Sequence, residues 1–506
     1  MTDEPTNAKS DLLSALYEIN DLESAAHLLV WDQATYMPPG GAPARARQCA
    51  TLRTLAHQKL VSSEFGRLLG EFEKSVNGMS HDSDDASLAR VTRRMYDEAA
   101  DVPPEFLYEF TEHTTACFSA WAVARPADDF GAVKDYLTKT LDLSRRYADF
   151  FPNSDHVADP LIEKSDYSMS VSTIQPIFAD LRQFLSALAR EIEEQQPSDP
   201  SFVGRVFEED AQRSASVDII QGFGYDFSRG RLDKTHHPFM TKFSLGDARI
   251  TTRFSEDSLA GMFGTMHESG HAMYEQGIDL SYERTPLANG TSSAVHESQS
   301  RMWENVVGRS EGFWSGYYPK LQQYFPYALG DVSLDTFYRS INHVSPSLIR
   351  VDADEVTYGL HIIIRFELEL ALLEGVLSID ELPEAWNAKY DEYLGITPTD
   401  DRDGVMQDVH WYTDFIGGMF QGYALGNVLA AQFYAAALAA NPTIPDQIAS
   451  GQFDILRNWL TDNIYRHGSK YTTLELVERV TGGPITTEPY KRYLRDKYGQ
   501  IYGLSA

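Results

Sequence analysis

Apolar residues spaced three and four positions apart run through most of this 506-residue chain and predict a mainly α-helical fold. Two long segments show this spacing most clearly: Leu12, Leu13, Leu16, Ile19, Leu22, Ala26 and Leu29, and then Ile174, Ile177, Leu181, Phe184, Leu185 and Leu188. We expect Pro176 to lie in the first turn of the second helix, where its missing N–H costs nothing. Because each such helix has one apolar face, the helices must pack on one another, which indicates a multi-helix architecture.

Two further helices are expected late in the chain, from near Asp354 to Gly375 and from Ala424 to Ala440. The second is strongly apolar, but it contains polar residues and is short for a membrane span, so we expect a buried helix and no membrane partner. The segment Gln195 to Pro200 is expected to be a surface loop. Because the sequence has no internal repeat and no evident linker, we expect one domain over residues 1–506, which at this length could form two lobes around a groove.

The helical spacing is interrupted between Phe239 and Phe254, where side chains alternate with a period of two on either side of Gly246-Asp247. This pattern predicts a β-hairpin directly before the next helix. An edge strand there could hold an extended peptide through main-chain hydrogen bonds. The hairpin could equally be plain scaffold, and both interpretations stay open.

The helix after this hairpin carries His267-Glu268-Ser269-Gly270-His271, an H-E-x-x-H motif. Its helical spacing is given by Leu259, Met262, Phe263, Met266, Gly270 and Met273. We expect the helix to begin near Ser255 and Asp257 and to end at Gly277. Two histidines four residues apart share one face and can both bind a zinc ion at about 2.0 to 2.1 Å, and Glu268 lies roughly 100° away as a general base. The motif therefore indicates a metal-dependent hydrolase.

A hydrolytic zinc site needs a third protein ligand and leaves its fourth position to water. The next expected helix, Thr291 to Val307, contains Glu297, which two helices joined by a loop can bring to both histidines. Arg301, one turn further on, could orient the Glu297 carboxylate. The alternative is a surface ion pair between these two side chains. The ligand types fit Zn²⁺ and accept Co²⁺ as well.

The formal net charge is −31, from 74 acidic against 43 basic residues, and it argues against nucleic acid as a partner. Of the basic residues, 13 are lysines and 30 are arginines. Lysine depletion with an acidic excess resembles the composition of proteins from organisms that accumulate molar salt, where the Debye length falls to about 3 Å. We hypothesise a halophile-adapted protein. The alternative is an ordinary acidic cytoplasmic protein.

Two features bear on cellular location. The first eleven residues lack the basic and apolar regions of a secretory signal. Cys49 and Cys117 alone cannot form a disulfide framework, which agrees with a reducing compartment. We therefore expect a cytoplasmic protein.

Several motifs in a fixed order give the chain a resemblance to a known family. They are Leu29-Val30-Trp31-Asp32-Gln33 with Met37-Pro38-Pro39-Gly40-Gly41, then His237-Pro238-Phe239, the D-x-R-x-T segment 247–251, the H-E-S-Q segment 296–299, the I-R-x-x-A-D segment 349–354 and the G-x-x-Q-D-x-H-W segment 404–411. With the zinc motif, they make the chain similar, nearly end to end, to the carboxypeptidase Taq family of zinc metallocarboxypeptidases, peptidase family M32. One departure follows Trp411, where the family usually has a Y-F-P-T-Y-like segment and this chain keeps only Tyr423 in register.

The resemblance implies a mainly α, multi-helix fold of the gluzincin metallopeptidase type, with a deep groove and a small β-hairpin or sheet beside the H-E-x-x-H helix. It also implies a homodimer that releases single C-terminal amino acids from peptides with a free C-terminus. A zinc oligopeptidase or endopeptidase could share the same residues. A non-catalytic zinc-containing peptide-binding protein is the alternative of a different class, and Glu268 argues against it because a structural site needs no base.

An exopeptidase must recognise the free chain end. A guanidinium suits a carboxylate because it is always charged and can donate two parallel hydrogen bonds. The matching motif makes Arg350 the first candidate for this contact and Arg249 the second, with structural ion pairs to Asp354 or Asp247 as the alternatives. The resemblance also makes His237 a candidate substrate contact.

The expected mechanism follows from these residues. Glu268 would take a proton from the attacking water and pass it to the leaving amine. His410 or Tyr423 is expected to hydrogen-bond the oxyanion that forms on the scissile carbonyl.

Overall fold

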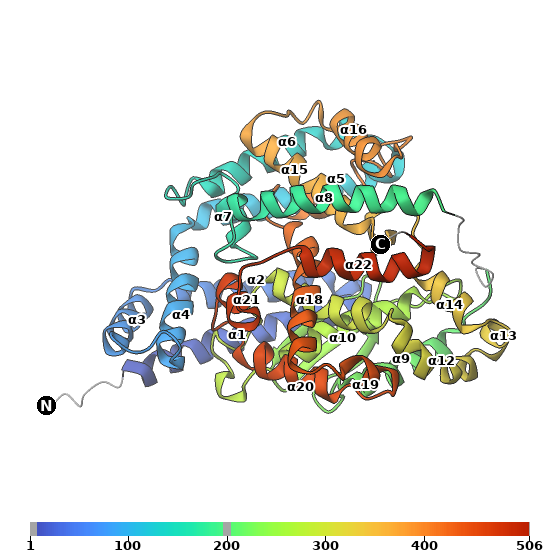
Figure 1. The fold of residues 1–506 in the computed structure, drawn as a ribbon. Coiled ribbons are helices and arrows are strands. Elements are labelled where there is room, and N and C mark those ends of the chain that lie inside the picture. The colour runs from blue at the N-terminus through green and yellow to red at the C-terminus, as the bar shows by residue number, and fades with distance from the viewer. Residues whose placement is uncertain (1–7, 196–203, 505–506) are drawn as a thin grey trace, which may run out of the picture.

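The computed structural model describes residues 8–195 and 204–504, and within them the fold is mainly helical, as predicted. Of the expected loop Gln195 to Pro200, all but Gln195 lies outside the described residues. The helices fall into three groups, and one small sheet lies among them (Figure 1).

The N-terminal group holds α1 (Ala8–Thr35), α2 (Ala42–Leu60), α3 (Ser63–Val76) and α4 (Asp84–Asp101). Helix α1 packs against α2, α3 and strand β2. Buried residues of α1, α2, α3 and α4 form a hydrophobic core of their own together with Leu245 and with Ile278, Tyr282, Leu287 and Ala288. The N-terminal helices therefore cover the sheet and the loop that follows the H-E-x-x-H helix.

The second group occupies the upper part of Figure 1. It comprises α5 (Pro104–Ala127), α6 (Gly131–Ala148), α7 (Asp159–Glu163), α8 (Val171–Glu193), α15 (Tyr358–Glu374), α16 (Leu382–Leu394) and α17 (His410–Thr413). Helix α15 packs against α6, α8, α16 and α18, and α17 packs against α5 and α6. Segments far apart in sequence thus meet at α15 and α17.

The third group contains the candidate site. It comprises α9 (Glu209–Phe223), α10 (Ala260–Gln276), α11 (Ser293–Arg301), α12 (Glu311–Tyr324), α13 (Pro326–Leu329), α14 (Leu334–Ile341), α18 (Gln421–Ala440), α19 (Ile444–Ala449), α20 (Asp454–Asn463), α21 (Thr473–Thr481) and α22 (Glu488–Tyr502). Helix α11 lies between α10 and α18 and contacts both. One large hydrophobic core runs through the second and third groups.

The sheet has three strands in the order β1-β3-β2, which are β1 (Leu232–Lys234), β3 (Asp247–Thr252) and β2 (Met240–Ser244). Strands β2 and β3 form the predicted hairpin, and β2 is an edge strand with an irregularity between Lys242 and Ser244. The sequence did not predict β1, which is only three residues long and pairs in parallel with β3. Helix α10 packs on β3 and β2, so the sheet lies beside the H-E-x-x-H helix as expected.

Two helices begin about one turn later than expected, and a third begins earlier. Helix α10 begins at Ala260, because Ser255 donates to Asp257 in a separate turn before it. Helix α15 begins at Tyr358, since the Asp354 carboxylate accepts from the amides of the turn ahead of the helix. Helix α8 begins at Val171, so that Pro176 lies inside the helix and not in its first turn.

Helix α18 is the predicted apolar helix. Among the described residues it is also the helix that is long and apolar enough to cross a membrane by length and composition, but 61% of that segment is buried within the protein. It contacts α11, α15, α21 and α22. The apolar run is therefore explained by a central position in the core.

Candidate metal centre

Three side chains from two helices converge at one point. His267 and His271 of α10 and Glu297 of α11 offer ligand atoms that all lie within 4.8 Å of one another. The Nε2 atoms of both histidines lie 3.5 Å from Glu297 Oε2. Zinc bonds of about 2.0 to 2.1 Å at tetrahedral angles place neighbouring ligand atoms about 3.4 Å apart. The residues present therefore fit a divalent metal of this type.

Two glycines allow the helices to approach closely enough for this arrangement. A Cβ at Gly270 of α10 would come within 2.5 Å of Gln299 O and 2.7 Å of Ser300 Cα on α11. A Cβ at Gly426 of α18 would come within 2.6 Å of Glu297 Cβ. Helix α11 is thus held between two neighbours at positions where only glycine fits.

The Glu297 carboxylate is fixed by its own helix. Arg301 Nε donates to Oε1 at 2.7 Å, which is the contact expected from the sequence, and Ser300 Oγ donates to Oε2 at 3.0 Å. Both side chains of the ion pair are largely buried, so the surface-pair alternative was wrong. Burial raises the pKa of Glu297, but the charge of Arg301 and the two histidines outweigh it and hold the pKa well below its usual value.

His267 has a partner that the sequence analysis missed. Its Nδ1 lies 2.9 Å from Glu304 Oε2, and Arg301 Nη1 donates to the same oxygen at 3.3 Å. Glu304 lies in Met302–Val307, which continues α11 as a π-helical segment. A wider turn of this kind shifts which side chains share a face, and helical spacing counted at 3.6 residues per turn does not anticipate it. Carboxylates that hold the second nitrogen of a ligating histidine are common in metal sites.

His271 has a different partner, also missed. Its Nδ1 lies 3.1 Å from His296 Nδ1, and His296 Nε2 lies 2.7 Å from Glu275 Oε1. Lys242 of β2 donates to Glu275 Oε2 at 2.6 Å. Glu275 could have been identified from the sequence, because it follows His271 by four residues and so lies on the same helix face.

Glu268 is buried beside these ligands, with 7% of its surface exposed. Burial raises the pKa of Glu268 to about 7, against the opposing effects of His267 and of a hydrogen bond from the main-chain amide of Met240. Met240 is the first residue of edge strand β2. A carboxyl group with a pKa near neutrality can both accept and release a proton at ordinary pH.

Arg350 is buried in a cluster of charges (7% exposed). Its Nε and Nη2 donate to the Asp408 carboxylate at 3.0 and 2.7 Å, and its Nη1 lies 3.4 Å from the Tyr358 hydroxyl. Arg365 of α15 pairs with the other Asp408 oxygen at 2.5 Å. The alternative prediction, an ion pair between Arg350 and Asp354, was wrong, because the Asp354 carboxylate caps the turn before α15.

Arg365 was not anticipated from the sequence. The sequence pattern could have predicted it, because Arg365 stands alone inside the apolar run Ile362-Ile363-Ile364-Arg365-Phe366. A buried guanidinium requires an acidic partner. Two arginines hold the pKa of Asp408 far below its usual value, although burial alone would raise it.

His410 and Tyr423 lie beside this cluster. His410 Nε2 is 3.4 Å from the Tyr423 hydroxyl, and the guanidinium of Arg350 lies 5.3 Å from the Tyr423 ring centre. Burial lowers the pKa of His410 to about 4. Burial raises the pKa of Tyr423, and the charge of Glu297 adds to this effect. The imidazole is therefore neutral and the phenol protonated at neutral pH.

Arg249 and His237 are placed differently. Arg249 donates two hydrogen bonds to Asp247, at 2.8 and 2.7 Å, and lies over the Trp31 ring of α1. The structural ion pair named as the alternative for Arg249 is therefore present. His237 is exposed in the connection between β1 and β2, three residues before the amide that contacts Glu268.

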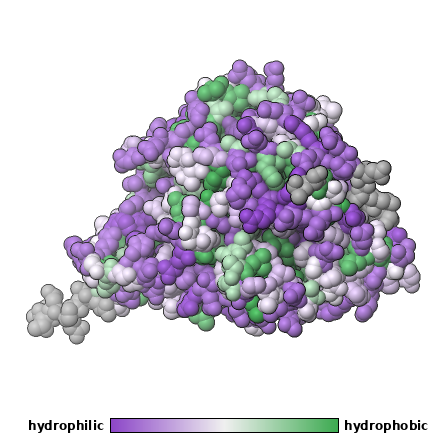
Figure 2. Space-filling model, in the orientation of Figure 1, coloured by the Kyte–Doolittle hydropathy of each residue, from purple (hydrophilic) through white to green (hydrophobic). Residues whose placement is uncertain are grey.

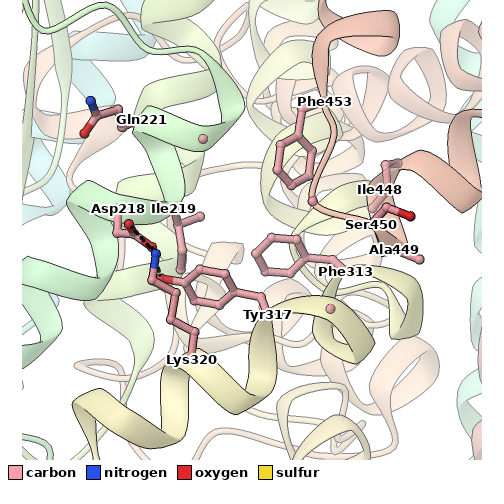
Figure 3. A pocket seen from close by; sticks show the side chains of 13 residues that line it. Asp218, Ile219, Gln221, Phe313, Tyr317, Lys320, Ile448, Ala449, Ser450 and Phe453 are labelled. Carbon is pink, nitrogen blue, oxygen red and sulfur yellow. Dashed lines mark hydrogen bonds and ion pairs between the residues drawn. The ribbon is translucent and has the colours of Figure 1, made fainter.

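A separate cavity of about 440 Å³ lies between α9, α12 and the segment after α19 (Figure 3). Its polar side chains bind one another, because Tyr317 and Lys320 both donate to Asp218. Phe313 and Phe453 supply much of its apolar wall. The cavity contains none of the site residues expected from the sequence.

An H-E-x-x-H helix joined by a glutamate from a second helix defines a metal-dependent peptidase site. Comparison with known proteins agrees with this class. The family model described as carboxypeptidase Taq (M32) metallopeptidase matches residues 11–498. The chain belongs to this family and is a hydrolase of the metallocarboxypeptidase type.

Similar proteins cover nearly the whole chain. "Thermostable carboxypeptidase 1" of Thermus thermophilus is 41% identical over 99% of this chain and 100% of its own length. "Carboxypeptidase 1" of Bacillus subtilis is 35% identical over 98% of both. The crystal structure of an M32 carboxypeptidase from Deinococcus radiodurans R1 superposes with a TM-score of 0.96 at 45% identity, covering 98% of this chain and 100% of that one.

Proposed function

We propose that this chain releases single amino acids from the free C-terminus of peptides, with a metal held by His267, His271 and Glu297 and with Glu268 as general base. The observation that carries the proposal is the convergence of three ligand atoms within 4.8 Å beside a buried carboxyl group. The family membership supports the class of reaction. Zn²⁺ is the proposed metal, with Co²⁺ as the alternative that the same ligand types accept.

The proposed chemistry divides between the metal and the side chains. A divalent metal held there would lower the pKa of a water molecule toward about 7 and would polarise the scissile carbonyl. Glu268 takes the proton of the attacking water and later hands it to the leaving amine. A hydrogen bond from the amide of Met240 is proposed to orient the Glu268 carboxylate. His410 and Tyr423 are proposed to hydrogen-bond the oxyanion, and His237 to contact the substrate.

Arg350 is the proposed anchor for the terminal carboxylate of the substrate. Asp408 occupies the Nε edge of its guanidinium and so fixes the plane of the group. The Nη1 edge faces the Tyr358 hydroxyl at the longer distance of 3.4 Å. We propose that this edge takes the carboxylate in a paired contact, while Arg365 keeps Asp408 neutralised. Arg249 is the weaker proposal, because Asp247 and Trp31 already engage it.

Three further expectations stay predictions. A homodimer should appear as twice the chain mass in light scattering. A cytoplasmic location can be tested by fractionation of the source cells. Cleavage of internal bonds, the oligopeptidase alternative, is tested by the peptide pair described at the end of the Discussion.

The variant Glu268→Gln tests the base directly. Because general base catalysis contributes about 10² to 10⁴-fold, we expect turnover to fall by that factor while the bound metal, measured by atomic emission, stays at the wild-type level. Glu256→Gln, in the exposed turn before α10, is the matched control and should keep full turnover. Turnover of Glu268→Gln close to that of the wild type would remove Glu268 from the mechanism.

A further inference from the structure

A chain of contacts leads from the candidate ligand His271 to strand β2. His271 Nδ1 meets His296 Nδ1 at 3.1 Å, and His296 Nε2 meets Glu275 Oε1 at 2.7 Å. Lys242 Nζ then donates to Glu275 Oε2 at 2.6 Å and to Asn289 Oδ1 at 3.0 Å. The chain thus joins α10, α11 and the sheet edge through side chains alone.

The proton positions along this chain are determined by the proposed metal contact. If His271 Nε2 faces the metal with its lone pair, its single proton lies on Nδ1 and is donated to His296 Nδ1. His296 must then carry its own proton on Nε2, which it donates to the Glu275 carboxylate. With the protons so placed, each imidazole has one donor and one acceptor satisfied, and Lys242 binds the carboxylate.

The surroundings are shaped to hold His296 in this place. A Cβ at Gly290 would come within 2.6 Å of His296 Nε2 and 2.9 Å of the Tyr274 ring. The Gly290 amide also donates to Glu275 Oε1 at 3.2 Å. The Tyr274 ring lies 4.8 Å from the His296 ring, centre to centre. Glu275 is 4% exposed, so its negative charge requires the partners that it has.

We propose that His296, Glu275 and Lys242 are positioning residues that orient His271 and set the affinity of the site for its metal. The inference rests on the proposed metal site. It makes the two histidine ligands unequal, because His267 contacts the carboxylate of Glu304 directly whereas His271 reaches a carboxylate only through a second imidazole. Strand β2 then contributes two contacts to the site. The main chain of Met240 binds the proposed base Glu268, and Lys242 binds Glu275 at the end of this chain of contacts.

Metal affinity of the folded protein, measured by competition with a chelator, tests the proposal without any activity assay. His296→Leu removes both hydrogen bonds, and we expect a loss of 10 to 100-fold, the usual effect of removing such a partner. His296→Gln keeps one acceptor and one donor and should restore most of the affinity. Lys242→Met should lower the metal affinity less than His296→Leu does, and Lys242→Arg should keep the affinity near the wild-type value.

Gly290→Ala gives a test that substitutes none of the residues in this chain of contacts. The added methyl group should displace the His296 ring and weaken metal binding. Because this overpacking also lowers the thermal midpoint, metal affinity is compared at a temperature where the metal-free variant is fully folded. If His296→Leu does not fold, Gly290→Ala and Lys242→Met still test whether these contacts set the metal affinity. Wild-type affinity in these folded variants would overturn the inference. Absence of divalent metal binding by the wild-type protein would overturn the proposed metal site instead.

Discussion

At the scale of single residues, each candidate ligand is fixed by a second side chain. Arg301 holds Glu297, Glu304 holds His267, and His296 holds His271. Such partners orient the ligating atoms before the metal arrives, and this reduces the cost of binding. The guanidinium of Arg350, the proposed anchor, is fixed in the same way by Asp408.

Glu369 of α15 is a buried carboxyl group outside this chemistry, and it gives a prediction for pH. Burial raises the pKa of Glu369 to about 8, although Trp411 Nε1 donates to its Oε1 at 2.7 Å. The folded state therefore keeps a proton that the unfolded chain loses near pH 4.3. The resulting stability is fully present below that pH and is lost as the pH rises toward about 8.

Glu369→Gln removes this titration. The stability difference, variant minus wild type, should grow in favour of the variant between pH 5 and 8, by an amount of the order of a few kcal/mol. Urea unfolding at several pH values measures it. Because the amide introduces its own constant cost, the slope with pH is the decisive quantity. A difference that is flat over this range would show that Glu369 ionises normally in the folded protein.

At the scale of elements, the position of α11 depends on two glycines. Gly270→Ala and Gly426→Ala should each push α11 away from its neighbour, costing about 1 to 3 kcal/mol of stability by overpacking and weakening metal binding as Glu297 moves. Gly264→Ala is the matched control on α10, since nothing lies within 4 Å of the added Cβ. It should be neutral or slightly stabilising. Equal effects of Gly264→Ala and Gly270→Ala, by thermal unfolding and chelator competition, would contradict this account.

The sequence predicted elements better than their ends and their irregularities. Hydrophobic spacing identified the H-E-x-x-H helix, the hairpin and the buried helix α18, because one continuous pattern specifies each. It could not predict β1, whose three residues carry too little pattern, or the π-helical segment that turns Glu304 toward His267. Glu297 and Arg301 were accessible from their spacing on one helix. Arg365 and Lys242 meet their partners only through tertiary packing.

At the scale of the whole molecule, acidic residues strongly outnumber basic ones. Figure 2 shows mostly hydrophilic side chains on one face, with hydrophobic ones in separate small groups. A net charge of −31 opposes the compact state by self-repulsion, and salt screens this repulsion over a Debye length of about 10 Å at 0.1 M and 3 Å at 1 M.

We therefore predict that the thermal midpoint and the activity rise together as KCl increases from 0.1 M to molar concentrations. Dialysis to low salt should lower the helical circular dichroism signal as repulsion returns. An unchanged spectrum and unchanged activity in low salt would instead support an ordinary acidic protein and count against halophilic adaptation.

Cleavage at a free C-terminus is proposed to depend on Arg350 as the anchor of the terminal carboxylate. The most direct measurement is mass spectrometry of one unmodified peptide and its C-terminally amidated twin, incubated in high salt with metal-reconstituted protein. We predict stepwise loss of single residues from the unmodified peptide alone. Arg350→Met should abolish this stepwise release. Arg249→Met should reduce it less, because Asp247 and Trp31 already engage Arg249. Internal cuts in both peptides would contradict the account and indicate an oligopeptidase.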